Sequence, residues 1–470
     1  MIKFGTGGWR ALIGEDFTKD NVRILSQALA DQIRLEKQEA KGFTVGYDRR
    51  FLSDTAAKWM SEVMAGNGIK VYYIPGTAPT PLIMFTVQLY GTIYGAAVTA
   101  SHNPAEYNGI KIFTEGGRDA AEDVTAGIED RINHIDPARI QSVDFQNGIE
   151  TGVIELINPF NTYIDSILRM IDVEAIRKRH LKVLLDPMFG VSKTCIQTVL
   201  ITARCDVDTI NDRHDTLFGG RLPSPSSETL QRLRSMVAEQ DYDLGIATDG
   251  DADRIGIIDR NGEFIHPNSV LVLLYYYLLK FKGWHGCAVR NIATTHLIDK
   301  IAAAFGEKCY EVPVGFKHIS SKMEEANAVI GGESSGGLTI RGHIKGKDGV
   351  FAASLLAEMI SVTGKSFTEL LNEIYEQFGF CCMVENNFHF DYATKDRLNE
   401  ILFIQKKLPE FQYEISGVRY DDGVKIYFKN GGWIIARFSG TEPLVRVFAE
   451  METEQAAKEV SGVLEDFLNL

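Results

Sequence analysis

The feature that most constrains this chain is a pattern of short apolar runs separated by amphipathic stretches, which occurs three times. In the first copy, apolar runs at 45–48 and 71–74 and a third that ends at Ser101 alternate with helix-like segments. The later copies place such runs at 183–186, 207–210, 244–247, 288–291, 310–312 and 328–330. Strands that alternate with helices at this spacing are typical of doubly wound α/β sheets. The sequence therefore predicts three diverged α/β domains with mixed, mainly parallel sheets.

After about residue 380 the pattern changes to one of alternating strands. Strand-like runs lie at 414–420, 424–429, 433–439 and 444–450, with hairpin signals between them, and a last amphipathic helix is expected over 454–468. This pattern predicts a smaller α+β domain with an antiparallel sheet, behind a linker near 376–382. The expected domains are 1–150, 151–258, 259–378 and 379–470.

Charge and cysteine usage exclude some classes of partner. A net charge of −14 opposes binding to nucleic acid or to an anionic membrane, so phosphates would need local cationic pockets. The six cysteines form no C-x-x-C pair, and the chain starts without an apolar signal region. We therefore expect reduced thiols in a cytoplasmic protein. The longest apolar run, 270–279, is far shorter than the ~20 residues that span a bilayer, and it predicts a buried helix.

The first polar loop, 99–104, has the sequence Thr-Ala-Ser-His-Asn-Pro. Ser101 is expected just past the carboxyl end of a strand, where open α/β sheets place their ligands. A serine needs a base, a metal or a prior phosphorylation for group transfer, and His102 and Lys111 lie nearby in the sequence. A plain turn is the alternative. The glycine-rich opening that ends at Arg10 is either an anion-binding loop or a plain one.

The second loop carries Asp249, Asp251 and Asp253, followed by Arg254. Carboxylates at i, i+2 and i+4 of an extended segment point the same way, and hard oxygen ligands in that number suit Mg²⁺. The register of a calcium-binding EF-hand does not fit, because Arg254 stands where that loop requires glycine. Arg254 is expected to hold a phosphate oxygen, and a solvated acidic turn is the alternative.

The third and fourth loops supply polar groups of other kinds. Glu333 and Ser335 lie among glycines and can hydrogen-bond sugar hydroxyls, with Lys317 upstream; a flexible surface turn is the alternative. The fourth loop offers two guanidinium groups, hydroxyls and backbone amides that suit a phosphate dianion, with a structural Arg–Glu pair as the alternative. Its candidate residues are Arg437, Ser439, Gly440, Thr441 and Arg446.

These motifs, in this order, resemble those of the α-D-phosphohexomutase superfamily of phosphoglucomutases and phosphomannomutases. The resemblance covers the whole chain, from 5–10 through 99–104, 249–254 and 333–336 to 437–443. It implies four domains around a central cleft, with a phosphoserine at Ser101. It also implies a set of ligand contacts: Mg²⁺ on the phosphoserine oxygen, Asp249, Asp251 and Asp253; the ligand phosphate on Arg437, Ser439, Gly440 and Thr441; and the sugar on Glu333 and Ser335.

Three positions depart from the pattern of the family. Many relatives that use mannose or glucosamine phosphates carry a histidine where this chain has Gly337, and Ser334 and Phe438 also differ from the usual residues. The absence of that histidine favours glucose phosphate as substrate. Phosphomannomutase and phosphoglucosamine mutase are the alternatives.

The resemblance implies a two-step transfer between hexose 1-phosphate and hexose 6-phosphate. The phosphoryl group of Ser101 passes to the free hydroxyl of the bound sugar, and the resulting 1,6-bisphosphate returns its other phosphoryl group. Glucose 1,6-bisphosphate is the expected activator. Lys111 is the expected acid/base and His102 a weaker candidate, while Arg254 and Arg10 share the charge of the transferred group. Two rivals are a phosphatase that uses Asp249 as its nucleophile and a non-catalytic sugar-phosphate sensor. The chain is expected to be a monomer or a homodimer.

Overall fold

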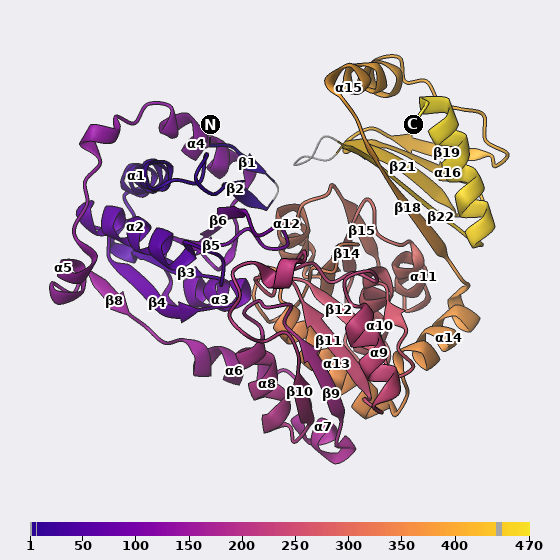
Figure 1. The fold of residues 1–470 in the computed structure, drawn as a ribbon. Coiled ribbons are helices and arrows are strands. Elements are labelled where there is room, and N and C mark those ends of the chain that lie inside the picture. The colour runs from indigo at the N-terminus through magenta and orange to yellow at the C-terminus, as the bar shows by residue number, and fades with distance from the viewer. Residues whose placement is uncertain (1, 6, 439–443) are drawn as a thin grey trace.

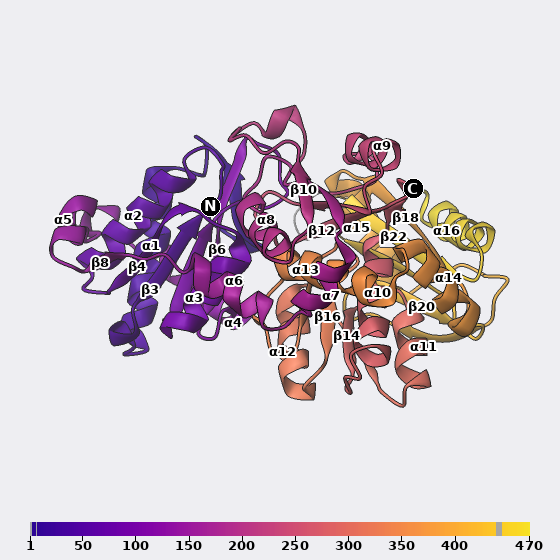
Figure 2. The same cartoon turned by 90° about the horizontal axis from the view of Figure 1, so that it is seen from below.

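The structure is a computed structural model that describes residues 2–5, 7–438 and 444–470. Figure 1 shows an N-terminal α/β unit in indigo and purple at the left and a C-terminal unit in orange and yellow at the upper right. Two further α/β units lie between them. In Figure 2, seen from below, the first and last units again lie at opposite ends.

The first unit is built on a mixed sheet with the strand order β1-β2-β6-β5-β3-β4-β8, to which β7 adds by pairing with β6. The strands are β1 (Phe4–Gly5), β2 (Gly8–Leu12), β3 (Phe43–Tyr47), β4 (Val71–Thr77), β5 (Tyr94–Val98), β6 (Tyr107–Thr114), β7 (Arg118–Asp119) and β8 (Ile154–Leu156). The helices are α1 (Lys19–Leu35), α2 (Ser53–Gly66), α3 (Thr80–Tyr90), α4 (Glu122–Ile132) and α5 (Phe145–Glu150). The strands β3, β4, β5 and β8 are parallel, whereas β6 is antiparallel to β5.

The second and third units repeat this plan with smaller sheets, ordered β10-β9-β11-β12-β13 and β15-β14-β16-β17. Their strands are β9 (Lys182–Asp186), β10 (Asp206–Thr209), β11 (Leu244–Thr248), β12 (Ile255–Asp259), β13 (Phe264–Ile265), β14 (Ala288–Asn291), β15 (Cys309–Val312), β16 (Ile330–Gly332) and β17 (Leu338–Ile340). Their helices are α6 (Phe160–Leu168), α7 (Val173–Arg179), α8 (Lys193–Thr202), α9 (Gln231–Glu239), α10 (Pro267–Lys280), α11 (Leu297–Ala304), α12 (Phe316–Ala326), α13 (Gly349–Thr363) and α14 (Phe367–Phe378).

The C-terminal unit has an antiparallel sheet ordered β18-β22-β21-β20-β19. Its elements are β18 (Cys382–His389), α15 (Tyr392–Asn399), β19 (Ile415–Arg419), β20 (Val424–Phe428), β21 (Trp433–Phe438), β22 (Leu444–Met451) and α16 (Glu454–Leu468). Strand β18, which was not predicted from the sequence, pairs with β22 along its whole length. Its middle residues are polar and half exposed, so this edge strand carries little of the apolar signal by which the other strands were predicted.

Each polar loop joins a strand to its antiparallel neighbour. The three loops described in full connect β5 to β6, β11 to β12 and β16 to β17, and the fourth lies between β21 and β22. In the α/β units the first strand of each pair also lies beside a parallel strand. The predicted fold class is confirmed: mixed α/β units and a C-terminal unit with an antiparallel sheet.

The interior contains the apolar helix that the sequence predicted. Helix α10 is buried along most of its length and packs with α13 and α14. Within the described ranges, no single helix is long and apolar enough to cross a membrane. Helices α13 and α14 pass that test only as a pair, and the chain bends by 76° between them.

Two of the expected domain boundaries fall before the last strand of a sheet. Strand β8 pairs with β4 beyond residue 150, and β13 pairs with β12 beyond residue 258. We therefore propose that the first two domains end after Leu156 and after Ile265.

Candidate active site

Ser101 lies just past the end of β5, as expected, and its side chain is buried. Its Oγ donates a hydrogen bond of 2.7 Å to Oδ2 of Asp249, which follows β11 of the next unit. Ser101 has a φ of 52°, a left-handed conformation that is uncommon for residues other than glycine. Backbone strain of this kind clusters at functional sites. The serine hydroxyl therefore meets the acidic loop across 148 residues of sequence.

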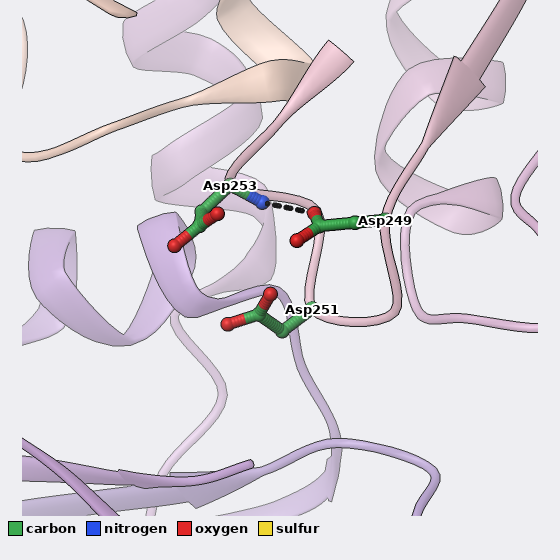
Figure 3. Close-up of side chains that lie close together, drawn as sticks. All are labelled: Asp249, Asp251 and Asp253. Carbon is green, nitrogen blue, oxygen red and sulfur yellow. Dashed lines mark hydrogen bonds between the residues drawn. The ribbon is translucent and has the colours of Figure 1, made fainter. Parts of the chain in front are cut away.

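The side chains of Asp249, Asp251 and Asp253 converge (Figure 3). One carboxylate oxygen from each lies within 4.8 Å of the others, and all three residues are buried. The backbone N–H groups of Asp253 and Arg254 donate to Asp249 Oδ1 at 3.1 and 3.0 Å. These two hydrogen bonds hold the loop in a tight curve around the carboxylates.

Two lysines from other units contact these carboxylates. Lys111 Nζ, from β6, lies 2.6 Å from Asp251 Oδ2 and 2.5 Å from Asp253 Oδ2. Lys347 Nζ, from the segment between β17 and α13, lies 3.0 Å from Asp253 Oδ2. Lys111 was predicted at the site from its sequence neighbourhood. Lys347 was not, because nothing in its sequence surroundings marks it as functional.

The pKa values of this cluster are shifted by burial and by its charges. Burial and the like charges of Asp251 and Asp253 raise the pKa of Asp249 well above its usual range. Burial opposes ionisation of Asp253 as well, but Lys111, Lys347 and Arg254 outweigh it and hold its pKa well below the usual range. Burial disfavours the charged form of Lys111, yet the same carboxylates raise its pKa, so its amine is an ammonium group at neutral pH.

The donor set of this cluster fits a divalent cation. The buried Oδ1 atoms of Asp251 and Asp253 have no hydrogen-bond partner among the described residues. Buried polar atoms are rarely left unpaired, and burial together with the neighbouring carboxylates raises the pKa of Asp249. Clustered carboxylate oxygens are the ligands that hard cations such as Mg²⁺ prefer. The three aspartates can therefore bind a metal ion.

Helix α3 also contacts the acidic loop, residues 249–254, through Thr80 at the start of the helix. Thr80 Oγ1 donates to Asp251 Oδ2 at 2.6 Å, and the Thr80 N–H donates to the Asp251 carbonyl at 2.9 Å. The positive end of a helix dipole favours a carboxylate at this position. Thr80 was missed in the sequence analysis. The only available signal was the helix-start motif Pro79-Thr80-Pro81, which indicates a helix N-terminus but no function.

Arg10 and Arg254 supply positive charge to the site, and His102 lies in the same serine loop as Asn103. Arg10 Nη1 donates to Asn103 Oδ1 at 2.7 Å in the serine loop. The buried Nε atoms of both arginines and Nδ1 of His102 have no hydrogen-bond partner in the part of the chain that the structure describes. Burial and the charges of Arg254 and Arg10 lower the pKa of His102 well below its usual range, so its ring is neutral. Unpaired guanidinium N–H groups beside the serine suit an anion such as a phosphoryl group.

The third loop adjoins the acidic loop. The Ile255 N–H, just after the acidic loop, donates to the Gly336 carbonyl at 3.3 Å. Glu333 is buried and accepts from the Gly315 N–H at 3.2 Å, while Ser335 Oγ lies 3.5 Å from its other carboxylate oxygen. Lys317 does not contact this pair: its Nζ lies 2.6 Å from Oε1 of Glu122 in the N-terminal unit.

The strand before the fourth loop is joined to the third unit through Asp422. Arg437, the last residue but one of β21, donates to Asp422 Oδ1, and Asp422 Oδ2 accepts from the Val314 N–H at 2.6 Å. Arg446 is the register partner of Arg437 on β22 and lies 3.8 Å from Glu385. Ser439, Gly440 and Thr441, the other predicted phosphate contacts, lie outside the described residues.

Comparisons with known proteins give a consistent result over the whole chain. The models of the phosphoglucomutase/phosphomannomutase alpha/beta/alpha domains I, II and III match residues 1–139, 161–262 and 266–378. The model of the C-terminal domain of the same family matches residues 394–465.

Individual relatives cover nearly the full length. The phosphoglucomutase/phosphomannomutase of Thermococcus kodakarensis is 31% identical over 460 residues, which is 97% of this chain and 96% of that protein. The phosphoglucosamine/phosphogalactosamine mutase of Sulfurisphaera tokodaii is 30% identical and covers 98% of both chains. The crystal structure of a Thermus thermophilus protein described as a phosphomannomutase is 29% identical and superposes with a TM-score of 0.83 over 99% of this chain and 97% of that one.

Ser101 lies beside three buried aspartates that can bind a metal ion, and all four parts of the fold match one family. The chain belongs to the phosphoglucomutase/phosphomannomutase family and is a phosphohexomutase, an enzyme that transfers a phosphoryl group within a sugar phosphate.

Proposed function

We propose that this enzyme interconverts glucose 1-phosphate and glucose 6-phosphate through a phosphorylated Ser101 and a glucose 1,6-bisphosphate intermediate. The observation that carries the proposal is the 2.7 Å hydrogen bond from Ser101 Oγ to Asp249 Oδ2, beside the carboxylates and cations described above. A transferring phosphoryl group needs positioning and charge stabilisation more than covalent help. This arrangement supplies both.

When the hydroxyl of Ser101 is free, its Oγ can attack a phosphoryl group of the bisphosphate. The bond from Ser101 Oγ to phosphorus forms as the bond from phosphorus to the sugar oxygen breaks. Asp249 Oδ2 accepts the serine proton, since it already accepts the hydrogen bond from Oγ. Transfer back to the sugar uses the same groups in reverse.

We assign to Lys111 the transfer of a proton to the sugar oxygen. Its ammonium form is held by Asp251 and Asp253, so it has a proton to give to the departing sugar oxygen. Arg10 and Arg254 offer unpaired N–H groups to the phosphoryl oxygens. His102 is neutral and stays a weaker candidate for proton transfer.

Mg²⁺ is the cation that we propose for the three aspartates, with the oxygen of Ser101 as a fourth ligand. When bound, it would neutralise charge on the transferring phosphoryl group as a Lewis acid. Asp249, Asp251 and Asp253 would hold it through carboxylate oxygens that are already close together and buried.

We assign sugar recognition to Glu333 and Ser335. Lys317 stays a further candidate, although it is paired with Glu122. The distal phosphate is assigned to Arg437, Arg446 and the loop 439–441. Glucose phosphate is the favoured substrate because this chain has Gly337 at the position where the family resemblance places a histidine in many relatives that use mannose or glucosamine phosphates. The names of the relatives leave phosphomannomutase and phosphoglucosamine mutase as alternatives.

Phosphorus NMR of a reaction mixture tests the chemistry. A mutase conserves total organic phosphate, whereas a phosphatase that uses Asp249 as its nucleophile releases free phosphate. Ser101→Ala is expected to lose mutase turnover while keeping its circular dichroism spectrum. Turnover close to that of the wild type, in a preparation free of other mutases, would exclude the phosphoserine route.

A coupled assay tests the choice of sugar. Glucose 1-phosphate, mannose 1-phosphate and glucosamine 1-phosphate are compared at equal enzyme concentration, each with a trace of its bisphosphate. The highest kcat/KM is expected for glucose 1-phosphate. A higher value for either of the others would reassign the substrate and leave the phosphoserine route intact.

A further inference from the structure

We propose that Arg50 is a positioning residue for phosphoryl transfer, because its guanidinium group holds the backbone of the Ser101 loop in its reactive conformation. The inference rests on the proposed role of Ser101 as the phosphoryl carrier. Arg50 lies after β3, in a different segment from the loop that it holds.

The guanidinium group donates to four backbone carbonyls of residues 101–107. Nη2 donates to the carbonyls of Ser101 and Asn103 at 2.7 and 2.6 Å, and Nη1 to those of Pro104 and Tyr107 at 2.7 and 3.0 Å. A planar guanidinium with several donors in fixed directions can make such a set of bonds, whereas an ammonium group cannot match its geometry. One side chain therefore fixes the path of the loop from the serine itself to Tyr107.

The guanidinium group is itself held in place from two sides. Arg50 Nε lies 3.5 Å from Asp48 Oδ2 in an ion pair that is almost fully buried. Asp48 also accepts hydrogen bonds from Thr99 Oγ1, at 2.6 Å, and from Ser53 Oγ. The Phe218 ring of the second unit lies over the guanidinium, with its centroid 4.8 Å from Arg50 Cζ. The donors are thus preorganised rather than mobile.

The Ser101 loop has a specific need for this support. Ser101 adopts a left-handed conformation that is unfavourable for residues other than glycine and persists only where the surrounding structure imposes it. The Ser101 carbonyl is also closely packed against the acidic loop, because a Cβ on Gly250 would lie only 2.7 Å from the Ser101 oxygen. Arg50 and the backbone at Gly250 thus both restrict the position of this carbonyl.

The adjacent Arg49 offers a matched control. Its Nη1 also donates to backbone carbonyls, but these belong to the second unit: Asp212 at 2.9 Å, and Phe189 and Arg213 at 3.4 Å. Arg49 thus joins the first two units without a hydrogen bond to the serine loop among its described contacts. Loss of Arg49 tests general packing between the units, whereas loss of Arg50 tests the position of the serine.

The experiment compares full-length Arg50→Met, Arg50→Lys, Arg49→Met and Ser101→Ala with the wild type. The measurements are kcat and KM for glucose 1-phosphate, and the single-turnover rate at which glucose 1,6-bisphosphate phosphorylates the protein, followed by intact mass. For Arg50→Met we expect kcat and the single-turnover rate to fall about 100-fold, since a displacement of about 1 Å costs that much. KM should stay within about threefold. Arg50→Lys should recover part of the rate, and Arg49→Met should stay within about threefold of the wild type.

Each other outcome overturns the proposal in a distinguishable way. If Ser101→Ala is inactive but Arg50→Met and Arg50→Lys transfer at the wild-type rate, Arg50 has no positioning role and the proposed function stands. If Arg49→Met loses as much rate as Arg50→Met, the effect is one of general packing. If Ser101→Ala keeps its turnover, the proposed function and this inference both fail. Should Arg50→Met not fold, Arg50→Lys takes its place as the test variant, because it keeps the buried charge beside Asp48 but cannot make all four hydrogen bonds. A wild-type transfer rate in Arg50→Lys would then exclude the positioning role.

Discussion

Lys347 Nζ lies 3.0 Å from Asp253 Oδ2, so the third α/β unit delivers a cation to the carboxylates of the second. The stem of Lys347 reaches this position by passing directly over Gly337. A Cβ at Gly337 would lie only 2.2 Å from Lys347 Cδ. The absence of a side chain at Gly337 therefore leaves room for the stem of Lys347, a residue that the sequence did not mark as functional.

Gly337→Ala should displace Lys347 from Asp253. We expect kcat to fall about tenfold or more, because a cation beside the transferring group is lost while the sugar contacts of Glu333 remain. The measurement is steady-state kinetics with glucose 1-phosphate. Gly76→Ala is the control, since no atom lies within 4 Å of a Cβ at that glycine. An unchanged kcat in Gly337→Ala would show that the position of Lys347 has no part in turnover.

Asp251→Asn should weaken metal binding. The substitution removes one of three carboxylates that offer oxygens within 4.8 Å of one another. We expect the Mg²⁺ concentration for half-maximal activity to rise at least tenfold. Activity of the wild type should also disappear with EDTA and return with Mg²⁺. Asp212→Asn, at a partly exposed ion pair with Lys193, is the control. Equal Mg²⁺ requirements in both variants would argue against a metal at the three aspartates.

Lys111→Met should slow phosphoryl transfer without preventing metal binding. General acid catalysis contributes roughly 10²–10⁴-fold, so kcat should fall by a factor in that range. The three carboxylates remain, and loss of a competing cation should leave the Mg²⁺ requirement the same or lower it. The check is the dependence of kcat on Mg²⁺ concentration. A wild-type rate at saturating sugar phosphate and Mg²⁺ would remove Lys111 from the proton-transfer role.

The contact between the third and C-terminal units should be sensitive to acid through His296. This ring stacks on Trp433, with centroids 5.4 Å apart, and its Nε2 lies 3.0 Å from Lys425 Nζ. Burial and the charge of Arg290 lower the pKa of His296 from 6.5 to about 4. Between pH 6.5 and pH 4 the unfolded chain binds a proton at this histidine that the folded chain does not. The contribution of neutral His296 to the free energy of unfolding is therefore complete above pH 6.5 and is lost as the pH falls towards 4.

The expected effect of His296 is about 2 kcal/mol of unfolding free energy between pH 7.5 and pH 5. Urea denaturation at the two pH values measures it. His296→Gln keeps an acceptor for Lys425 but cannot be protonated, so it should lose about that much of the pH dependence. His389→Gln is the control, on the edge strand β18. If both variants retain the full pH dependence, another group causes it.

The sequence alone specified a large part of this protein. Periodicity located most strands and helices of the four units, because apolar side chains must face a core with the spacing of their element. The residue types in the loops indicated the serine and the aspartates, since phosphoryl transfer and metal binding need those donors. The edge strand β18 was missed because its polar residues are half exposed and leave little apolar pattern.

Only the tertiary structure decided which groups meet. Ser101, Lys111 and Thr80 come from the first unit and Lys347 comes from the third, yet all four contact the acidic loop of the second. No local pattern encodes such contacts, because they depend on how whole sheets pack against one another. Arg50 illustrates the same point: in the sequence it is one arginine of a pair, and only the folded chain brings four carbonyls of the serine loop to its guanidinium group.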